Sequence, residues 1–291
     1  MMRFPSPPSS QRPGAQRGFA LIAVLWLVAA LSVMVAGLTQ TVKSEFRSAS
    51  FSRQSLQATA LGESAIQLAL QEMVMSGQPP DKLIMAPVPV GGQTVDAQMI
   101  PMNGYIDINR APVELLQALF QFAGGLDQGA AASVAALIES ARTVPGPSGR
   151  PPGFEASEDL LLLPGMDYPL YARVAPLITT EAGGSGGVNV RAAPAGVLAV
   201  LSGGNEATVS NYLQARSEDN ATADTSQMNG AWVDAGSQSN TVEFTARVRL
   251  PDGDAIMVIR RYTITPNSAD GLPWRAFYAT SRVESAPMPK P

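Results

Sequence analysis

The chain has 291 residues, of which 45% are hydrophobic and 15% charged, with 20 basic and 24 acidic side chains and a formal net charge of −4. This length is enough for one or two domains with a substantial core. Cysteine and histidine are both absent, which excludes disulfides, Ser-His-Asp and Cys-His catalytic centres and histidine metal sites. The acidic balance argues against nucleic acid as a partner, because phosphate binding depends on basic side chains.

The first predicted element is a helix over residues 19–40, an apolar run without a charged residue. At about 1.5 Å per residue, a helix of this length would cross the roughly 30 Å of hydrocarbon in a bilayer. Three arginines and no acid precede the run, so residues 1–18 are expected to stay in the cytoplasm while the rest is exported. The sequence therefore predicts a single transmembrane span at 19–40.

The flanks of this run differ from those of an ordinary signal peptide, which has a shorter apolar stretch followed by a small-residue cleavage site. Here the small residue, Gly18, lies before the run and directly precedes Phe19. Cleavage between them would remove a basic leader, leave the apolar helix as the new N-terminus and bring the net charge near −7, with 17 basic and 24 acidic residues left. The stretch resembles the class III leaders of type IV pilins and type II secretion pseudopilins. An uncleaved signal anchor is the alternative.

Ala23 would be the fifth residue of the processed chain. Most pilin-like subunits carry glutamate there, and in that family the carboxylate neutralises the N-terminal ammonium of a neighbouring subunit. A buried carboxylate without such a partner would be costly. By this resemblance, the missing glutamate predicts a subunit at the end of a filament, with no neighbour ahead of it.

The helix is expected to continue beyond the apolar run and to end near Ser76. No proline interrupts residues 40–78, and Gly77 and Pro79 supply the stop signals. Apolar residues at steps of mostly three and four predict one buried stripe that packs on a folded head, formed by Val42, Phe46, Ala49, Leu56, Ala60, Ile66, Leu70 and Met73.

Strand-like alternation appears on both sides of a central helical block. Residues 90–102 alternate before the block, residues 241–265 read as a hairpin around Pro251-Asp252-Gly253, and residues 274–283 add a last strand. The predicted fold class is α+β, with a pilin-like long N-terminal helix packed on an antiparallel sheet. Its predicted parts are a leader at 1–18, the long helix at 19–76, β parts at 77–103 and 229–291, and an inserted all-helical domain at 104–228.

The helical block repeats itself: IDINRAPVELLQAL (106–119) aligns without gaps on VNVRAAPAGVLAVL (188–201). In both copies an Asp or Asn, Asp107 or Asn189, can bond the backbone of a turn. A proline, Pro112 or Pro194, then lies where the first helical turn has no N–H to lose. These four residues mark a structural repeat. The segment EDLLLLPGMDYPLYARVAPLIT (158–179) has the further pattern of a helix-hairpin-helix.

Together, these features resemble the minor pseudopilin family called general secretion pathway protein K, over residues 17–283. The resemblance rests on the leader without the fifth-position glutamate, the insert with two Ala-Pro helix starts, the 158–179 segment and the closing hairpin. It implies cleavage by prepilin peptidase, methylation of the Phe19 amine, and an inner-membrane protein with its C-terminal domain in the periplasm. It further implies a subunit that initiates and caps the pseudopilus of a type II secretion system. The expected partners are other minor pseudopilins and, at the tip, the secreted substrate.

Two other assembly or binding roles are alternatives. The start of the repeat also resembles competence-type helix-hairpin-helix DNA receptors, which need a glycine-rich hairpin backed by lysine or arginine. Residues 122–133 (FAGGLDQGAAAS) contain an acid and no base, so no nucleic-acid partner is expected. A minor pilin of a type IV pilus shares the N-terminal features, but the long helical insert argues against it.

No catalytic or cofactor site is predicted, because the acidic clusters lie in turn-like segments that are typically solvated. The polar stretch 217–234 collects oxygen ligands of the kind that calcium prefers, with Asp219, Asp224 and Asp234 as candidates. Their spacing does not match an EF-hand loop, although the resembled family includes pseudopilins that bind calcium. A polar loop is the favoured interpretation, and a calcium site is the alternative.

Overall fold

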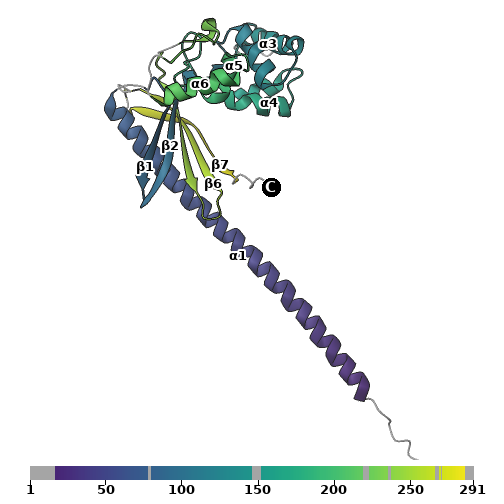
Figure 1. The fold of residues 1–291 in the computed structure, drawn as a ribbon. Coiled ribbons are helices and arrows are strands. Elements are labelled where there is room, and N and C mark those ends of the chain that lie inside the picture. The colour runs from purple at the N-terminus through teal and green to yellow at the C-terminus, as the bar shows by residue number, and fades with distance from the viewer. Residues whose placement is uncertain are drawn as a thin grey trace, which may run out of the picture. The chain divides into compact units, whose positions relative to one another are not determined.

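The computed structural model describes residues 17–77, 80–145, 152–218, 223–234, 237–265, 269 and 271–285. Within the first helix, the side chains of residues 17–21, 23, 36–44 and 47 lie outside this description. The chain divides into two compact units, residues 1–56 and residues 57–291. The secondary structure combines helices with an antiparallel sheet (Figure 1), which confirms the predicted α+β class.

The first unit is formed by the N-terminal part of helix α1 (Arg17–Ser76). Its described apolar side chains face solvent; Trp26, for example, is 73% exposed and Val33 74%. Among the residues described, no helix combines the length and the hydropathy that a membrane span requires. Much of the predicted span at 19–40 falls on residues 19–21, 23 and 36–40, whose side chains lie outside the described set.

The second unit contains a five-stranded antiparallel sheet in the order β1-β2-β5-β6-β7 (Figure 1). Strand β2 pairs with β5 across the whole helical insert, so that Asp96 lies opposite Arg247. The strands are β1 (Ile84–Val90), β2 (Gln93–Pro101), β5 (Thr241–Arg249), β6 (Ala255–Ile264) and β7 (Trp274–Glu284).

Strand β1 lies within the predicted β part at 77–103, although no strand pattern was recognised over its own residues. It contains Pro87 and Pro89, and proline within a run argues against a central strand. The sheet accommodates both residues because β1 lies at an edge. The two prolines therefore indicate an edge strand rather than the absence of a strand.

The C-terminal part of α1 packs on the sheet, but the predicted stripe is only partly correct. Ile66, Leu70 and Met73 are buried, as expected. Phe46 and Leu56 are 73% and 72% exposed, and Ala49 and Ala60 are exposed too. The buried face instead continues N-terminally through Ala58, Gly62 and Ala65.

Gly62 explains this choice of face. A Cβ at this position would lie 2.6 Å from Val258 Cγ2, so the helix approaches the sheet as closely as it does because the residue is glycine. Polar contacts fix the helix next to this point. Glu63 forms an ion pair with Arg260, and the Gln67 amide donates to the Tyr262 hydroxyl at 2.9 Å.

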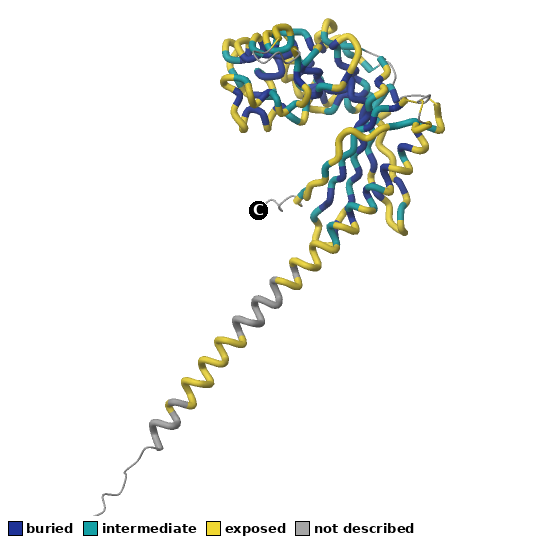
Figure 2. Tube along the Cα trace, turned by 180° about the vertical axis from the view of Figure 1, so that it is seen from behind, coloured by how far each residue is buried: buried dark blue, intermediate teal, exposed yellow. Residues whose placement is uncertain are grey.

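A helical insert lies between β2 and β5 and has a hydrophobic core of its own, seen as dark blue in Figure 2. Besides helices, the insert contains two short strands that the sequence analysis did not anticipate, β3 (Ile106–Asp107) and β4 (Ile178–Thr179), which pair in parallel. The helical elements are η1 (Met102–Gly104), α2 (Val113–Ala118), η2 (Leu119–Ala123), α3 (Gln128–Thr143), η3 (Ser157–Leu162), α4 (Tyr168–Val174), η4 (Ala175–Leu177), α5 (Ala195–Leu201), α6 (Glu206–Ser217) and η5 (Gly230–Trp232).

Candidate functional site: a duplicated helical hairpin

Each copy of the repeat opens with a buried polar side chain that bonds the next turn. Asp107 Oδ1 accepts from the amide of Asn109 at 2.9 Å, and Asn189 Oδ1 accepts from the amide of Arg191 at 3.1 Å. Asp107 is 3% exposed and Asn189 is fully buried. Both side chains form Asx turns, which reverse the chain after a short extended segment.

The two prolines begin their helices in the same way. Pro112 precedes α2 with ψ 146° and Pro194 precedes α5 with ψ 157°, so each is the N-cap residue and lies one position before the first helical turn. Each proline carbonyl accepts two amides, at 3.0 and 3.1 Å, from Leu115 and Leu116 in the first copy and from Val197 and Leu198 in the second. The proline thus orders the helix start through its carbonyl and its restricted φ.

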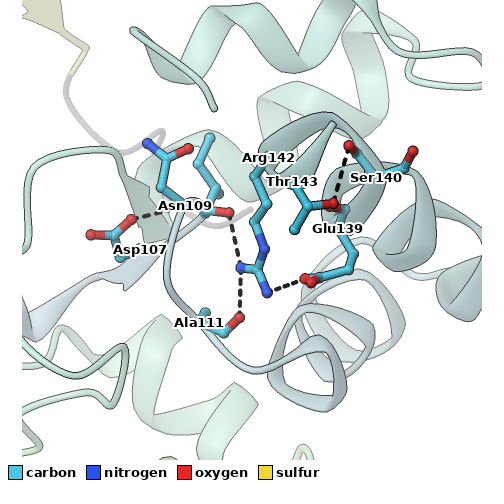
Figure 3. A network of polar contacts seen from close by, with 8 residues as sticks. Asp107, Asn109, Ala111, Glu139, Ser140, Arg142 and Thr143 are labelled. Atoms are coloured by element: carbon cyan, nitrogen blue, oxygen red, sulfur yellow. Dashed lines mark hydrogen bonds and ion pairs between the residues drawn. The ribbon is translucent and has the colours of Figure 1, made fainter. Parts of the chain in front are cut away.

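An arginine from a second helix secures each turn. Arg142 of α3 donates Nη1 to the carbonyl of Ala111 at 2.7 Å and to that of Ile108 at 3.3 Å. Figure 3 shows its guanidinium between Ala111 and the carboxylate of Glu139, with which it forms an ion pair.

The second copy repeats this contact. Arg216 of α6 donates Nη1 to the carbonyl of Ala193 at 2.6 Å and to that of Val190 at 3.4 Å. Ala193 and Val190 are the residues that align with Ala111 and Ile108. Burial lowers the pKa of Arg216, an effect that Tyr212 opposes. The half-buried guanidinium acts as a donor to the backbone.

Each copy of the repeat is consequently a helical hairpin rather than a single helix start. The first hairpin consists of α2 and α3, and the second consists of α5 and α6. The second helix of each copy begins with a side-chain cap: Asp127 accepts from the amide of Ala130 at 2.9 Å, and Asn205 accepts from the amide of Thr208 at 3.2 Å. Sequence comparison missed this half because α3 and α6 start out of register with the gap-free alignment and also differ in length, with 16 and 12 residues. A gap-free alignment therefore does not pair the two arginines, although each is a basic residue in the last turn of its helix.

The two copies hold different neighbours. In the second copy, Asn189 Nδ2 donates to the carbonyls of Asp81 at 2.8 Å and Ser237 at 3.2 Å, and Arg191 forms an ion pair with Asp81 at 2.6 Å. The amide of Leu83 also donates to the carbonyl of Arg191 at 3.1 Å. The second hairpin thereby binds the segment that joins α1 to β1.

The first copy holds the loop before η3 instead. Asn109 accepts from the amide of Phe154 at 2.8 Å and donates to its carbonyl at 2.9 Å. Asp107 Oδ2, which takes the place of Asn189 Nδ2, is buried and has no hydrogen-bond partner. Burial raises the pKa of Asp107, while the bond from the Asn109 amide and the charge of Arg110 oppose the rise.

A polar pocket of about 270 Å³ lies beside the first hairpin and is lined in part by Asn109, Arg110 and Arg142. Both arginines there contact backbone: Arg110 donates to the carbonyl of Gly184 at 2.9 Å, and Arg142 donates to Ile108 and Ala111. The arrangement therefore organises the chain.

A buried acid also links the insert to the sheet. The Tyr105 hydroxyl donates to Glu243 Oε1 at 2.9 Å, and Arg261 Nε donates to Glu243 Oε2 at 2.8 Å. Glu243 is 7% exposed. Burial raises the pKa of Tyr105 well above its ordinary value, and Glu243 adds to the rise. The phenol therefore remains a proton donor to this carboxylate.

Of the three candidate calcium ligands, the structure describes Asp224 and Asp234. Asp219 lies outside the described residues. Asp224 is exposed and accepts from the amide of Ser226 at 2.8 Å, a bond that lowers its pKa, while Asp234 accepts from the Ser185 hydroxyl at 2.8 Å. Within the described ranges, no group of three or more His, Cys, Asp or Glu side chains could hold a metal ion.

The candidate processing residues Gly18 and Phe19 belong to α1 by their backbone. Their side chains, and that of Ala23, lie outside the described residues. Cleavage at this bond and the role assigned to Ala23 therefore stay predictions.

No family model matches the chain, and no curated protein matches it. A solved structure that resembles it is the crystal structure of the GspK-GspI-GspJ complex from the type 2 secretion system of enterotoxigenic Escherichia coli. The identity is 15% and the TM-score 0.46, with 82% of this chain and 99% of that chain covered. Similarity of this degree establishes neither family nor function.

Proposed function

We propose that this chain is a minor pseudopilin, which acts by subunit assembly in a type II secretion system and catalyses no reaction. The observation that carries the proposal is helix α1. Its described N-terminal side chains, from Ile22 to Val35, are exposed although they are almost all apolar. From Ala58 to Met73 the same helix is one layer of a folded core on an antiparallel sheet.

The exposed apolar residues require an apolar environment. Covering one large apolar side chain is favourable by about 1.5–3 kcal/mol, and several lie in this stretch, including Leu25, Trp26 and Leu27. The Ser32 hydroxyl donates to the carbonyl of Val28 at 2.8 Å, so it does not oppose removal from water. We propose that the inner membrane covers this helix before assembly and that helices of other pseudopilins cover it afterwards.

Small residues favour the second environment. Ala29, Ala30 and Ser32 follow one another closely on α1, and small side chains let helix backbones approach when van der Waals contact drives association. Prepilin peptidase cleavage between Gly18 and Phe19, with methylation of the new amine, would precede this step.

A tip position is the finer part of the proposal. The absence of glutamate at Ala23 removes the group that would neutralise a preceding subunit, and the large helical insert makes stacking of another subunit difficult. The resembled family suggests two other minor pseudopilins as direct partners and the secreted substrate as a further contact. A minor pilin of a type IV pilus would use the same helix, and the insert favours the secretion system.

Three cap residues argue against the helix-hairpin-helix DNA alternative. Asp127, Asp167 and Asn205 accept from helix-start amides, the groups that a phosphate would need. Two of the three are acids, and a carboxylate there repels phosphate.

The direct test is the intact mass and N-terminal residue of the protein purified from its own cell membranes. We expect an N-terminus at Phe19 and a methylated amine. Gly18→Leu should block removal of the leader, while the matched change Gly14→Leu within the leader should leave processing unchanged. Normal processing of the Gly18→Leu variant, or an intact natural N-terminus, would reduce the chain to an ordinary exported protein and sink the pseudopilin proposal.

A further inference from the structure

The two edges of the sheet differ in the backbone groups that they expose. Successive residues of an antiparallel strand direct their N–H and C=O groups to opposite neighbours. The Leu250 amide donates to the carbonyl of Asp254 at 2.8 Å. The even-numbered residues of β5 and β6 therefore direct their N–H and C=O groups toward each other. The register then directs the odd-numbered residues of β6 toward β7 and the odd-numbered residues of β1 away from the sheet.

The β1 edge is closed to another strand. Its outward residues are Met85, Pro87 and Pro89, and the two prolines have no N–H to donate. Prolines at such positions are a known means of blocking edge-to-edge pairing.

The β7 edge is open. Beyond the register shift between β6 and β7 at Arg261/Tyr262, the outward residues are Ala279, Ser281 and Val283. All three are exposed, and β7 contains no proline. In the described part of the chain no strand lies beyond β7, so the segment Tyr278–Glu284 presents an unblocked row of donors and acceptors.

The neighbouring side chains bring positive charge to this edge. Arg282 contacts the Met257 sulfur at 3.3 Å and forms no ion pair with a carboxylate among the residues described. Glu284, the acid on the same strand face, is already paired with Arg247 at 2.7 Å. An added strand would place its alternate side chains beside Arg282, where a carboxylate is favoured.

We propose that Tyr278–Glu284 is a docking edge for an extended, acidic segment of another protein, which adds to the sheet as a further strand. Main-chain bonds to the outward residues of β7 would supply affinity, and the charge of Arg282 would select the acidic partner. This inference does not rest on the proposed function, because it follows from the sheet alone.

Binding of a defined probe to the full-length protein in detergent tests the proposal. The probe is a fluorescent nine-residue peptide that alternates valine with glutamate, and the matched probe carries lysine in place of glutamate. In an anisotropy titration, we expect saturable binding of the acidic peptide and at least about tenfold weaker binding of the basic one. Absence of binding by the acidic peptide, or equal affinity for both peptides, overturns the proposal.

Two variant pairs locate the contact. Ser281→Pro removes an outward N–H without removing one from the β6–β7 ladder and should weaken binding about tenfold, whereas Met85→Pro at the opposite edge should leave the affinity unchanged. Arg282→Glu keeps the backbone and should reverse the preference between the two probes. Arg249→Glu is the matched control. Arg249 lies on the same sheet face but in β5, which β6 separates from β7, and it is 3.9 Å from Asp96, so this change should leave the preference between the probes unaltered.

Circular dichroism of each variant confirms that the fold is retained. Unchanged binding by both Ser281→Pro and Arg282→Glu would place the peptide elsewhere and refute the docking edge. Self-association of the protein that Ser281→Pro abolishes would assign the edge to a second copy of the chain, and would refute the acidic segment as its occupant.

Discussion

Arg216 occupies in the second hairpin the place that Arg142 occupies in the first. Each guanidinium donates to the carbonyl of the alanine in its Ala-Pro pair. Arg216 donates to Ala193 at 2.6 Å, and Arg142 donates to Ala111 at 2.7 Å. The two helices that carry them differ in length. The conserved element between the copies is therefore this contact rather than the spacing along the chain.

Removing the arginine should destabilise the insert. Arg142→Met keeps much of the apolar stem but loses bonds to the carbonyls of Ile108 and Ala111, and bonds to charged donors are worth about 1.5–3 kcal/mol. We expect a loss of about 2–3 kcal/mol in the free energy of unfolding, measured by urea titration. Arg110→Met is the control, since Arg110 is exposed. An equal loss in both variants would contradict a special role for Arg142.

Asp107 should make stability depend on pH. Burial raises its pKa above the ordinary value of 3.8, so the folded state holds this proton more tightly than the unfolded state. The contribution of Asp107 to stability is present below pH 3.8 and is lost as the pH rises through the folded pKa. Asp107→Asn should remove this component and flatten the pH profile of the unfolding free energy above pH 3.8.

The reciprocal variant in the second hairpin is the matched control. Asn189→Asp replaces a donor to the carbonyls of Asp81 and Ser237 with an acceptor, and we expect about 2–4 kcal/mol of destabilisation at neutral pH. This loss should shrink on acidification. A pH profile identical to that of the unaltered chain in either variant would refute the account of these buried side chains.

Gly62 should tolerate no side chain. Its added Cβ would meet Val258 Cγ2 at 2.6 Å, and overpacking of this kind costs about 1–3 kcal/mol. Gly62→Ala should therefore lower the unfolding free energy. The same change made in a Val258→Ala background, where the clashing methyl group is absent, should lower it by less. Gly129→Ala, where the nearest atom is 3.4 Å away, should be neutral or stabilising. Full tolerance of Gly62→Ala would show that helix and sheet are not held this close.

The surface pair between Arg191 and Asp81 should matter less than the buried bonds beside it. The two side chains are 30% and 40% exposed, and exposed ion pairs contribute about 0–1 kcal/mol. Asp81→Asn should thus change stability by less than about 1 kcal/mol, while Asn189→Ala should cost more. Hydrogen exchange at Leu83, whose amide donates to Arg191, would report the loosening in each variant.

Local patterns in the chain are sufficient to predict the α+β class, because strand alternation, turn residues and helix stops are short-range signals. The hairpin around Pro251-Asp252-Gly253 appears in the structure as β5 and β6. The end of α1 at Ser76, next to Gly77 and Pro79, follows from the same kind of signal.

Features that depend on distant partners could not be read in this way. The buried face of α1 is chosen by the close approach of Gly62 to Val258, which no spacing of apolar residues reveals. Strand β1 is recognisable only once its edge position is known, since its prolines otherwise argue against a strand. The arginine contacts were hidden because the second helices of the two hairpins start out of register with the repeat and differ in length.

The second hairpin also determines how the molecule would respond to mechanical force. Along the chain, tension that passes the end of α1 reaches residues 81–83 before strand β1, and there Asn189 and Arg191 hold Asp81 and Leu83 by backbone and ionic contacts. Tension would therefore divide between strand β1 and the helical insert. In this respect the insert is an anchor for the end of the helix, which resists peeling of the edge strand β1.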